Sequence, residues 1–244
     1  MKKSVLTIIL VTMFLFTGSA FAAPLTGYKA GDVAVDLNFR SAKNSVSSAE
    51  FPNIRLNETI EFGRKLNFEP SVTVGIADRW AIQYRNVNAK SKTVYVFDDG
   101  DGVNVYADNK LNVNEFNVLY SVTSNISAFA GYVRTKSTVN FTDDINSLSD
   151  TMSGSKNTWQ IGLLGVVPIV DRLSLYGVLG VGSKWQNYEI GLSYAFTKNV
   201  AFNLDYRYMK AGKFDGRQGS FFNFEGFKSN SKSRGLGFGV TFKF

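Results

Sequence analysis

The chain has 244 residues, of which 44% are hydrophobic, 14% aromatic and 19% charged, with no Cys, no His and a formal net charge of +7. Soluble domains carry about 25% charged residues, so this composition favours a protein whose surface does not wholly face water. The absence of Cys and His excludes disulfides, thiolate sites, and the commonest general base and metal ligand. Composition therefore argues against most enzymes.

The amino terminus has the pattern of a secretory signal peptide. Lys2 and Lys3 precede an apolar segment, Val5 to Phe16, and Gly18 to Ala22 is a small-residue stretch of the kind that signal peptidase cleaves. We expect cleavage after Ala22, since an uncleaved anchor helix would need a longer apolar run. This divides the chain into a signal peptide, 1–22, and a mature domain, 23–244, whose formal charge is +5 because two lysines leave with the signal peptide. No other apolar run approaches the roughly 18 residues of a spanning helix.

The rest of the chain alternates apolar and polar residues at every second position, which predicts β-strands. The carboxyl-terminal segment shows this best, because Leu236, Phe238, Val240, Phe242 and Phe244 alternate with glycine and polar residues. A helix of this sequence would contain three glycines, each costing ~1 kcal/mol relative to alanine. In chain order, the predicted strands are 31–40, 68–76, 80–87, 116–122, 126–135, 159–167, 173–182, 188–196, 200–209 and 233–244.

The connections between these strands predict how they are arranged. Four are tight, at 78–79, 124–125, 171–172 and 198–199, and most of the others are long and polar, so that short and long connections alternate. Transmembrane barrels have short periplasmic turns and long outer loops, and lipid requires the sheet to close. We therefore predict an all-β fold, a closed antiparallel up-and-down transmembrane β-barrel of ten strands, with eight as the alternative. A soluble sandwich or lipocalin-like barrel is the other interpretation.

Aromatic residues near the predicted strand ends fit the interfacial girdles of such a barrel. They are Trp80, Trp159, Phe129, Phe196 and Phe244.

The mature chain resembles small outer-membrane β-barrels of the OmpA, OmpX and opacity-protein type. The ending Gly239 to Phe244 is similar to the signal that the barrel assembly machinery reads, with Phe238, Val240, Phe242 and Phe244 as its apolar positions. The segments 116–120, 129–132 and 192–196 resemble the hairpins of these proteins. The resemblance implies the bacterial outer membrane as location, with outer-membrane lipid, lipopolysaccharide and the assembly machinery as partners. It includes no peptidoglycan-binding domain.

The polar face of each strand should point into the lumen. That set contains four basic and four acidic residues, which predicts ion pairs that fill a narrow interior rather than a charge-selective pore. The inward residues are Asp36, Arg40, Gln83, Arg85, Glu115, Tyr132, Arg134, Glu189, Asp205 and Arg207. A narrow, low-conductance porin is the alternative.

No catalytic, metal or cofactor site is predicted. A Ser-His-Asp relay cannot be built without His, so a hydrolytic barrel enzyme is the least favoured function. The acidic run 98–102 fails the calcium-loop pattern, and Gly177 to Gly182 lacks the helix that nucleotide binding needs.

The segment 210–234 is the candidate contact surface for a ligand outside the cell. It carries six basic and two acidic residues with five phenylalanines, which fits an anionic surface polymer. Nucleic acid is not expected at that location. The alternative is that this hairpin extends the last strands above the membrane. The predicted contact residues are Lys213, Arg217, Phe221, Phe222, Phe224, Phe227 and Lys228.

Overall fold

The computed structural model describes residues 26–50, 59–98, 103–143, 149–217 and 228–244. Within these ranges every regular element is a strand, and no helix has the length and apolar character to cross a membrane. The strands are β1 (Val33–Glu50), β2 (Thr59–Glu61), β3 (Lys65–Ala77), β4 (Trp80–Lys90), β5 (Val94–Asp98), β6 (Asn104–Thr123), β7 (Ile126–Asp143), β8 (Ser149–Val170), β9 (Leu173–Gly182), β10 (Trp185–Ala195), β11 (Val200–Arg217) and β12 (Lys228–Lys243). The predicted signal peptide lies outside the described residues.

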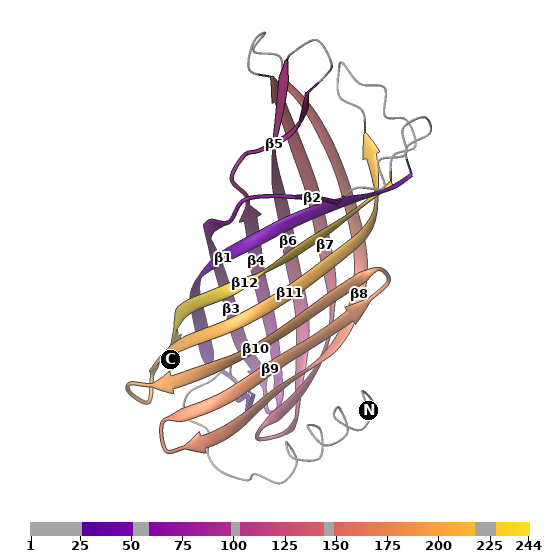
Figure 1. Ribbon diagram of the computed structural model, residues 1–244. Coiled ribbons are helices and arrows are strands. Elements are labelled where there is room, and N and C mark those ends of the chain that lie inside the picture. The colour runs from indigo at the N-terminus through magenta and orange to yellow at the C-terminus, as the bar shows by residue number, and fades with distance from the viewer. Residues whose placement is uncertain (1–25, 51–58, 99–102, 144–148, 218–227) are drawn as a thin grey trace, which may run out of the picture.

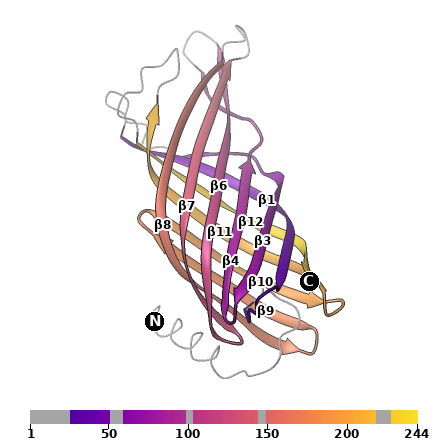
Figure 2. The same cartoon turned by 180° about the vertical axis from the view of Figure 1, so that it is seen from behind.

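Ten of these strands form one closed antiparallel barrel (Figures 1 and 2). Each pairs with its neighbour around the ring, and the ring closes because β1 pairs with β3 on one side and with β12 on the other. The short strands β2 and β5 pair with β1 and β6 as additions to this ring. The predicted fold, an up-and-down barrel of ten strands, is confirmed, and the alternative of eight strands is wrong.

The four predicted tight turns join the strands at one end of the barrel, which we call the turn end; the opposite end is the loop end. A fifth tight turn, Ser183–Lys184, joins β9 to β10 at the loop end, so the predicted alternation of short and long connections is wrong there. Lys184 has a φ of 60° in this turn. Because β9 and β10 are short, β8 and β11 reach past their turn and pair directly at Gly154 and Gly216.

Several strands extend farther toward the loop end than the alternation predicted. β6 has 20 residues and β8 has 22. The segment 210–234 is likewise not one loop, because 210–217 belongs to β11 and 228–234 to β12. The predicted alternative, in which this hairpin extends the last strands, is therefore correct for these parts.

The outer face of the barrel is apolar. Large side chains such as Leu204, Phe238 and Ile190 are exposed there, whereas the opposite face of the same strands is polar and buried. Aromatic rings pack across strands on this face, with Phe39 5.3 Å from Phe68 and 5.8 Å from Phe238 between ring centroids. An apolar exterior around a polar interior is the arrangement of a membrane-spanning barrel of the outer-membrane type, and a soluble barrel would reverse it.

Four of the five predicted girdle aromatics are exposed on the barrel: Trp80, Trp159, Phe196 and Phe244. The fifth, Phe129, is only 7% exposed and packs with other buried side chains inside the lumen, so its predicted girdle position is wrong. Its strand, β7, carries apolar residues on both faces, which made the inward face hard to recognise.

Candidate functional site: the barrel lumen

A layer of charged side chains crosses the middle of the lumen. Arg40 of β1 donates from Nε to Glu69 Oε2 of β3 at 3.0 Å and from Nη1 to Asp205 Oδ1 of β11. Arg207, also of β11, donates from Nη2 to the same Glu69 oxygen at 2.6 Å. The four side chains are at most 3% exposed. Two guanidinium groups and two carboxylates therefore form one continuous buried network.

Arg85 and Glu189 extend this network across the interior. Arg85 of β4 donates from Nη1 to Glu189 Oε2 of β10 at 3.3 Å, and these two strands are not neighbours in the sheet. Arg207 Nη1 lies 3.9 Å from the same Glu189 oxygen. Because the contact joins opposite parts of the wall, side chains span the lumen at this level.

A second polar chain leads from the charged layer toward the wall at β8. Gln160 of β8 donates from Nε2 to Glu115 Oε2 at 3.0 Å and to Asn117 Oδ1 at 2.8 Å, both on β6. Trp185 of β10 donates from its indole Nε1 to Gln160 Oε1 at 2.7 Å and is almost fully buried. Trp185 thus occupies the lumen with a bulky ring whose one polar atom is satisfied.

Glycine on the inner face makes room for these long side chains. A Cβ at Gly237 would lie 2.9 Å from the Arg40 guanidinium, which crosses over this position to reach Asp205. A Cβ at Gly191 would lie 2.6 Å from the Tyr176 ring and 2.7 Å from the Asp205 side chain. Gly237, one of the glycines that alternate along β12, and Gly191 on β10 therefore leave space for the network.

Apolar clusters lie on both sides of the charged layer. Toward the turn end, Leu119, Phe129, Leu164 and Tyr176 pack together with Tyr28. Toward the loop end, the cluster comprises Ala42, Val87, Ala89, Leu111, Val113, Val133, Trp185, Met209, Ala211 and Phe214. The described part of the lumen is thus filled by stacked layers of alternating character.

The segment before β1 closes the lumen at the turn end. Thr26 donates from Oγ1 to the Ser124 carbonyl at 2.7 Å and accepts at its own carbonyl from Ser127 Oγ at 2.9 Å. The carbonyl of Tyr28 accepts a hydrogen bond from the Arg79 amide at 2.9 Å. Tyr28 itself is only 2% exposed. Burial raises the pKa of the Tyr28 phenol to about 12. We call residues 26–32 the strap.

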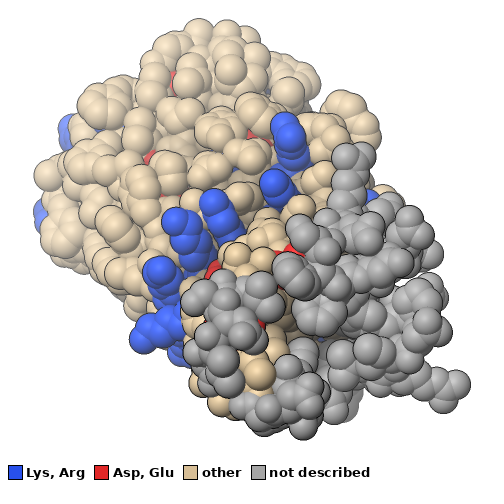
Figure 3. All heavy atoms as spheres, turned by 90° about the horizontal axis from the view of Figure 1, so that it is seen from above, with Lys and Arg blue, Asp and Glu red and all other residues tan. Residues whose placement is uncertain are grey.

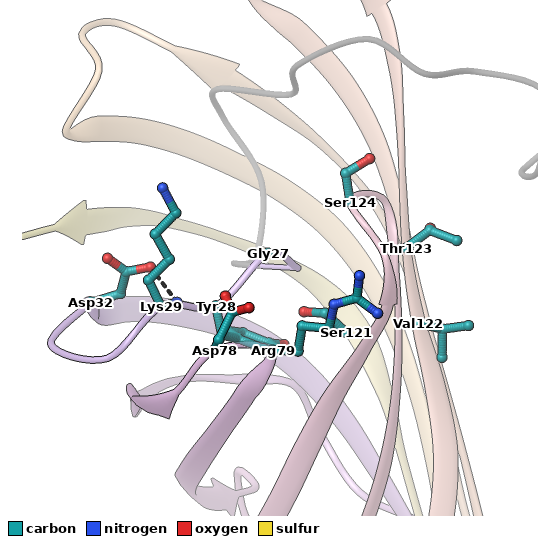
Figure 4. A pocket seen from close by; sticks show the side chains of 10 residues that line it. All are labelled: Gly27, Tyr28, Lys29, Asp32, Asp78, Arg79, Ser121, Val122, Thr123 and Ser124. Atoms are coloured by element: carbon teal, nitrogen blue, oxygen red, sulfur yellow. Dashed lines mark hydrogen bonds between the residues drawn. The ribbon is translucent and has the colours of Figure 1, made fainter.

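A cavity of about 300 Å³ lies where the strap meets two of the tight turns (Figure 4). The dashed contact in this view is the Lys29 amide donating to Asp32 Oδ2 at 2.9 Å. The cavity is lined by Gly27, Tyr28, Lys29, Asp32, Asp78, Arg79, Ser121, Val122, Thr123 and Ser124.

The structure brings most of the predicted lumen residues together. Asp36, Arg40, Gln83, Arg85, Glu115, Glu189, Asp205 and Arg207 belong to the inner face. Asp36 accepts from Thr241 Oγ1 at 2.6 Å and from Ser71, and Gln83 donates to Thr73 Oγ1 at 3.1 Å.

Arg134 and Tyr132 contradict the predicted lumen position. Arg134 is exposed and opposite Asn114 on the outer face, and Tyr132 packs against the exposed ring of Trp159 at 5.6 Å. The rule that polar residues point inward holds only along the apolar band. β7 continues beyond that band, where its outer face meets a polar environment.

Sequence reasoning missed Glu69, Gln160 and Trp185. Glu69 lies on the polar face of the predicted strand 68–76, alternating with Phe68, Pro70 and Val72, so the same rule could have found it. No such pattern indicated that Trp185 points into the lumen, because this residue lies outside the predicted strand 188–196.

The predicted assembly-signal residues and loop-contact residues lie outside the charged layer of the lumen. Phe238, Val240 and Phe242 belong to the outer face of β12, and Phe244 follows it, with its amide donating to the Val33 carbonyl at 2.8 Å. Of the loop contacts, Lys213 and Arg217 belong to β11 and Lys228 to β12, by their backbone alone. Phe221, Phe222, Phe224 and Phe227 lie outside the described residues.

In the described ranges, no group of three or more Asp or Glu side chains is arranged to hold a metal ion. Most of the acidic run 98–102 lies outside these ranges.

No protein-family model and no curated protein matches the chain. Among solved structures, the barrel is similar to the attachment invasion locus protein Ail of Yersinia pestis, at 12% identity and a TM-score of 0.43 over 87% of this chain and 99% of that one. It is also similar to the outer membrane protein OprG of Pseudomonas aeruginosa, at 17% identity and a TM-score of 0.44 over 90% and 99% of the two chains. Neisserial surface protein A matches at 18% identity and a TM-score of 0.35 over 88% and 99%.

Proposed function

We propose that this chain is an integral outer-membrane protein without enzymatic activity, whose lumen is occluded and whose loop end serves envelope integrity or contact at the cell surface. The observation that carries the proposal is the buried network of Arg40, Glu69, Asp205 and Arg207, which Arg85 and Glu189 continue across the lumen. A pore for solutes needs a continuous water path, and these side chains occupy its course.

The size of the barrel supports an occluded lumen. Barrels of about eight strands have interiors just wide enough for side chains to fill, and broad channels need sixteen or more. With ten strands, the ring is close to the lower size. The Tyr28 ring and the cluster around Trp185 then add apolar layers on either side of the ion pairs.

The connections support an orientation in which the tight turns face the periplasm and the loop end faces outward. In this orientation the strap lies at the periplasmic mouth, on the side from which the mature amino terminus would reach it. Phe244 then lies at the periplasmic interface, where the barrel assembly machinery would read the terminal strand. Lipopolysaccharide would surround the loop end.

The absence of catalysis is supported by the environment of the acidic side chains. Glu189 and Asp205 could act as paired carboxylates, but each is bound to arginine inside the network. A carboxylate held in ion pairs is a poor general acid, and the sequence has no His to replace it.

A narrow, low-conductance porin is the second candidate function, and one observation favours it. Within the described residues, several buried polar atoms of the lumen have no protein partner: Glu69 Oε1, Glu115 Oε1, Asn187 Oδ1, Asp205 Oδ2 and Arg207 Nε. Buried polar atoms are usually satisfied, commonly by water, so these atoms favour a hydrated passage beside the network.

Single-channel recording of the purified barrel in planar bilayers, with solute uptake by liposomes in parallel, tests the proposal. An occluded lumen predicts no resolved current steps and no uptake of small sugars. Steady openings that scale with salt concentration would replace the proposal with the porin.

A further inference from the structure

Four cations gather on three adjacent strands at the loop end of the outer wall. Lys210 of β11 is directly opposite Lys232 of β12, and Arg234 of β12 is directly opposite Lys43 of β1. We call these four residues the cationic cluster. Figure 3 shows the protein from the loop end, where a row of Lys and Arg side chains lies on the surface.

The cationic cluster begins where the apolar outer face ends. On β12, Phe238 and Leu236 are exposed to the membrane, and Arg234 and Lys232 are the next outward residues toward the loop end. On β11, Tyr206 and Tyr208 come before Lys210 in the same way. These cations are therefore at the height of the headgroups of the outer leaflet.

The pairing of like charges is unfavourable in the barrel by itself. Directly opposite side chains on a sheet face have Cβ atoms roughly 5 Å apart, and like charges there are destabilising. Among the described side chains, no carboxylate lies within ion-pair distance of Lys210 or Lys232. A bound anion would offset this repulsion.

Glu61 of β2 partly neutralises the other half of the cationic cluster. Its Oε2 lies 2.6 Å from Lys43 Nζ and its Oε1 lies 3.6 Å from Arg234 Nη2. The hydrogen bond from Lys43 lowers the pKa of this carboxyl, so it is ionised at neutral pH. The cluster with Glu61 keeps a net positive charge, and its uncompensated part is the pair Lys210 and Lys232.

We propose that the cationic cluster is a binding site for the phosphates of lipid A in the outer leaflet. Lys and Arg donors bind phosphate oxygens through charge-assisted hydrogen bonds, and the headgroup height selects a lipid-borne phosphate over a free one. This inference rests on the proposed orientation of the barrel, with its loop end outward, and it is independent of whether the lumen conducts.

The test is titration of the purified full barrel with lipid A, followed by native mass spectrometry in detergent. At ~1 kcal/mol for each Lys near an anionic lipid surface, Lys210→Gln combined with Lys232→Gln weakens binding about 30-fold. Glu61→Gln acts in the opposite direction and tightens binding, because it raises the net charge of the cluster. The matched control is Arg172→Gln with Lys198→Gln, which removes two positive charges at the turn end and leaves lipid A affinity unchanged.

The unfolding temperature supplies a second test, because lipid A should reverse which of the two proteins is the more stable. Without lipid A, the Lys210→Gln, Lys232→Gln variant unfolds at the same temperature as the wild type or a higher one, because a like-charge pair is gone. With lipid A, the wild type gains more stability than the variant. Equal lipid A affinity of wild type and double variant overturns the site, and equal affinity for inorganic phosphate or phosphatidylglycerol overturns lipid A as its ligand. Current steps in a bilayer would overturn the occluded lumen and leave this site standing.

Discussion

Replacing Arg207 with Met tests how much the lumen network contributes to stability. The substitution keeps most of the side-chain volume and removes the positive charge that lies 2.6 Å from Glu69 and 3.9 Å from Glu189. Glu69 keeps one partner, Arg40 at 3.0 Å, and Glu189 keeps Arg85 at 3.3 Å. Because removal of one member of a buried ion pair leaves an uncompensated charge, we expect a loss of about 3–5 kcal/mol in the free energy of unfolding.

The measurement is urea unfolding of the barrel in phospholipid vesicles, followed by tryptophan fluorescence. A second substitution, Glu69→Gln, tests whether the loss comes from charge. If it does, the double variant loses less than the sum of the two single variants, since the uncompensated carboxylate is gone. A loss below ~1 kcal/mol for Arg207→Met, the range of solvated ion pairs, would refute the reasoning that the network is dry and tightly paired.

Three further predictions concern other parts of the barrel. Leu204→Arg places a charge on the membrane face, where Leu204 is 48% exposed, and should lower the free energy of unfolding in vesicles by ~2–4 kcal/mol. An unchanged free energy of unfolding would contradict a lipid-facing position of this residue. Phe244→Ser should lower the amount of folded, heat-modifiable protein in the outer membrane, and normal levels would contradict a role of this residue in assembly. The Tyr28 phenol should titrate near pH 12, which is measured as the difference in ultraviolet absorbance between wild type and Tyr28→Phe during a pH titration. A value near 10 would place the ring in water. Because burial raises this pKa, the contribution of the neutral Tyr28 phenol to the stability of the fold is complete below pH 10 and is lost as the pH rises through 12.

The strand pattern was predictable because each strand alternates along the apolar band. Phe202, Leu204 and Tyr206 face outward in alternation with Asn203 and Asp205, as the sequence indicated. Above the band that constraint ends, so the length of β6 and the outward position of Arg134 could not be read from alternation. The tight turn Ser183–Lys184 was missed for another reason, because Trp185 to Asn187 lay outside the predicted strand 188–196 and the connection therefore looked longer than it is.

The partners inside the lumen were much less predictable than the strands. By sequence, the carboxylates nearest to Arg207 on the inner face are Asp205, two residues away, and Glu189 on the preceding strand, and Glu189 does lie 3.9 Å from it. In the structure Asp205 binds Arg40, and Arg207 binds Glu69, 138 residues away in the chain. Such contacts depend on which walls face each other across the closed barrel and on the space that Gly237 leaves for Arg40.

Conductance of the wild type and of Arg207→Ala, recorded in the same planar bilayer, tests most directly the claim that paired charges occlude the lumen. This claim predicts a silent wild type, and a variant that shows small current steps because the arginine between Glu69 and Glu189 is gone. A wild type that passes nanosiemens currents, with no increase in the variant, would contradict it.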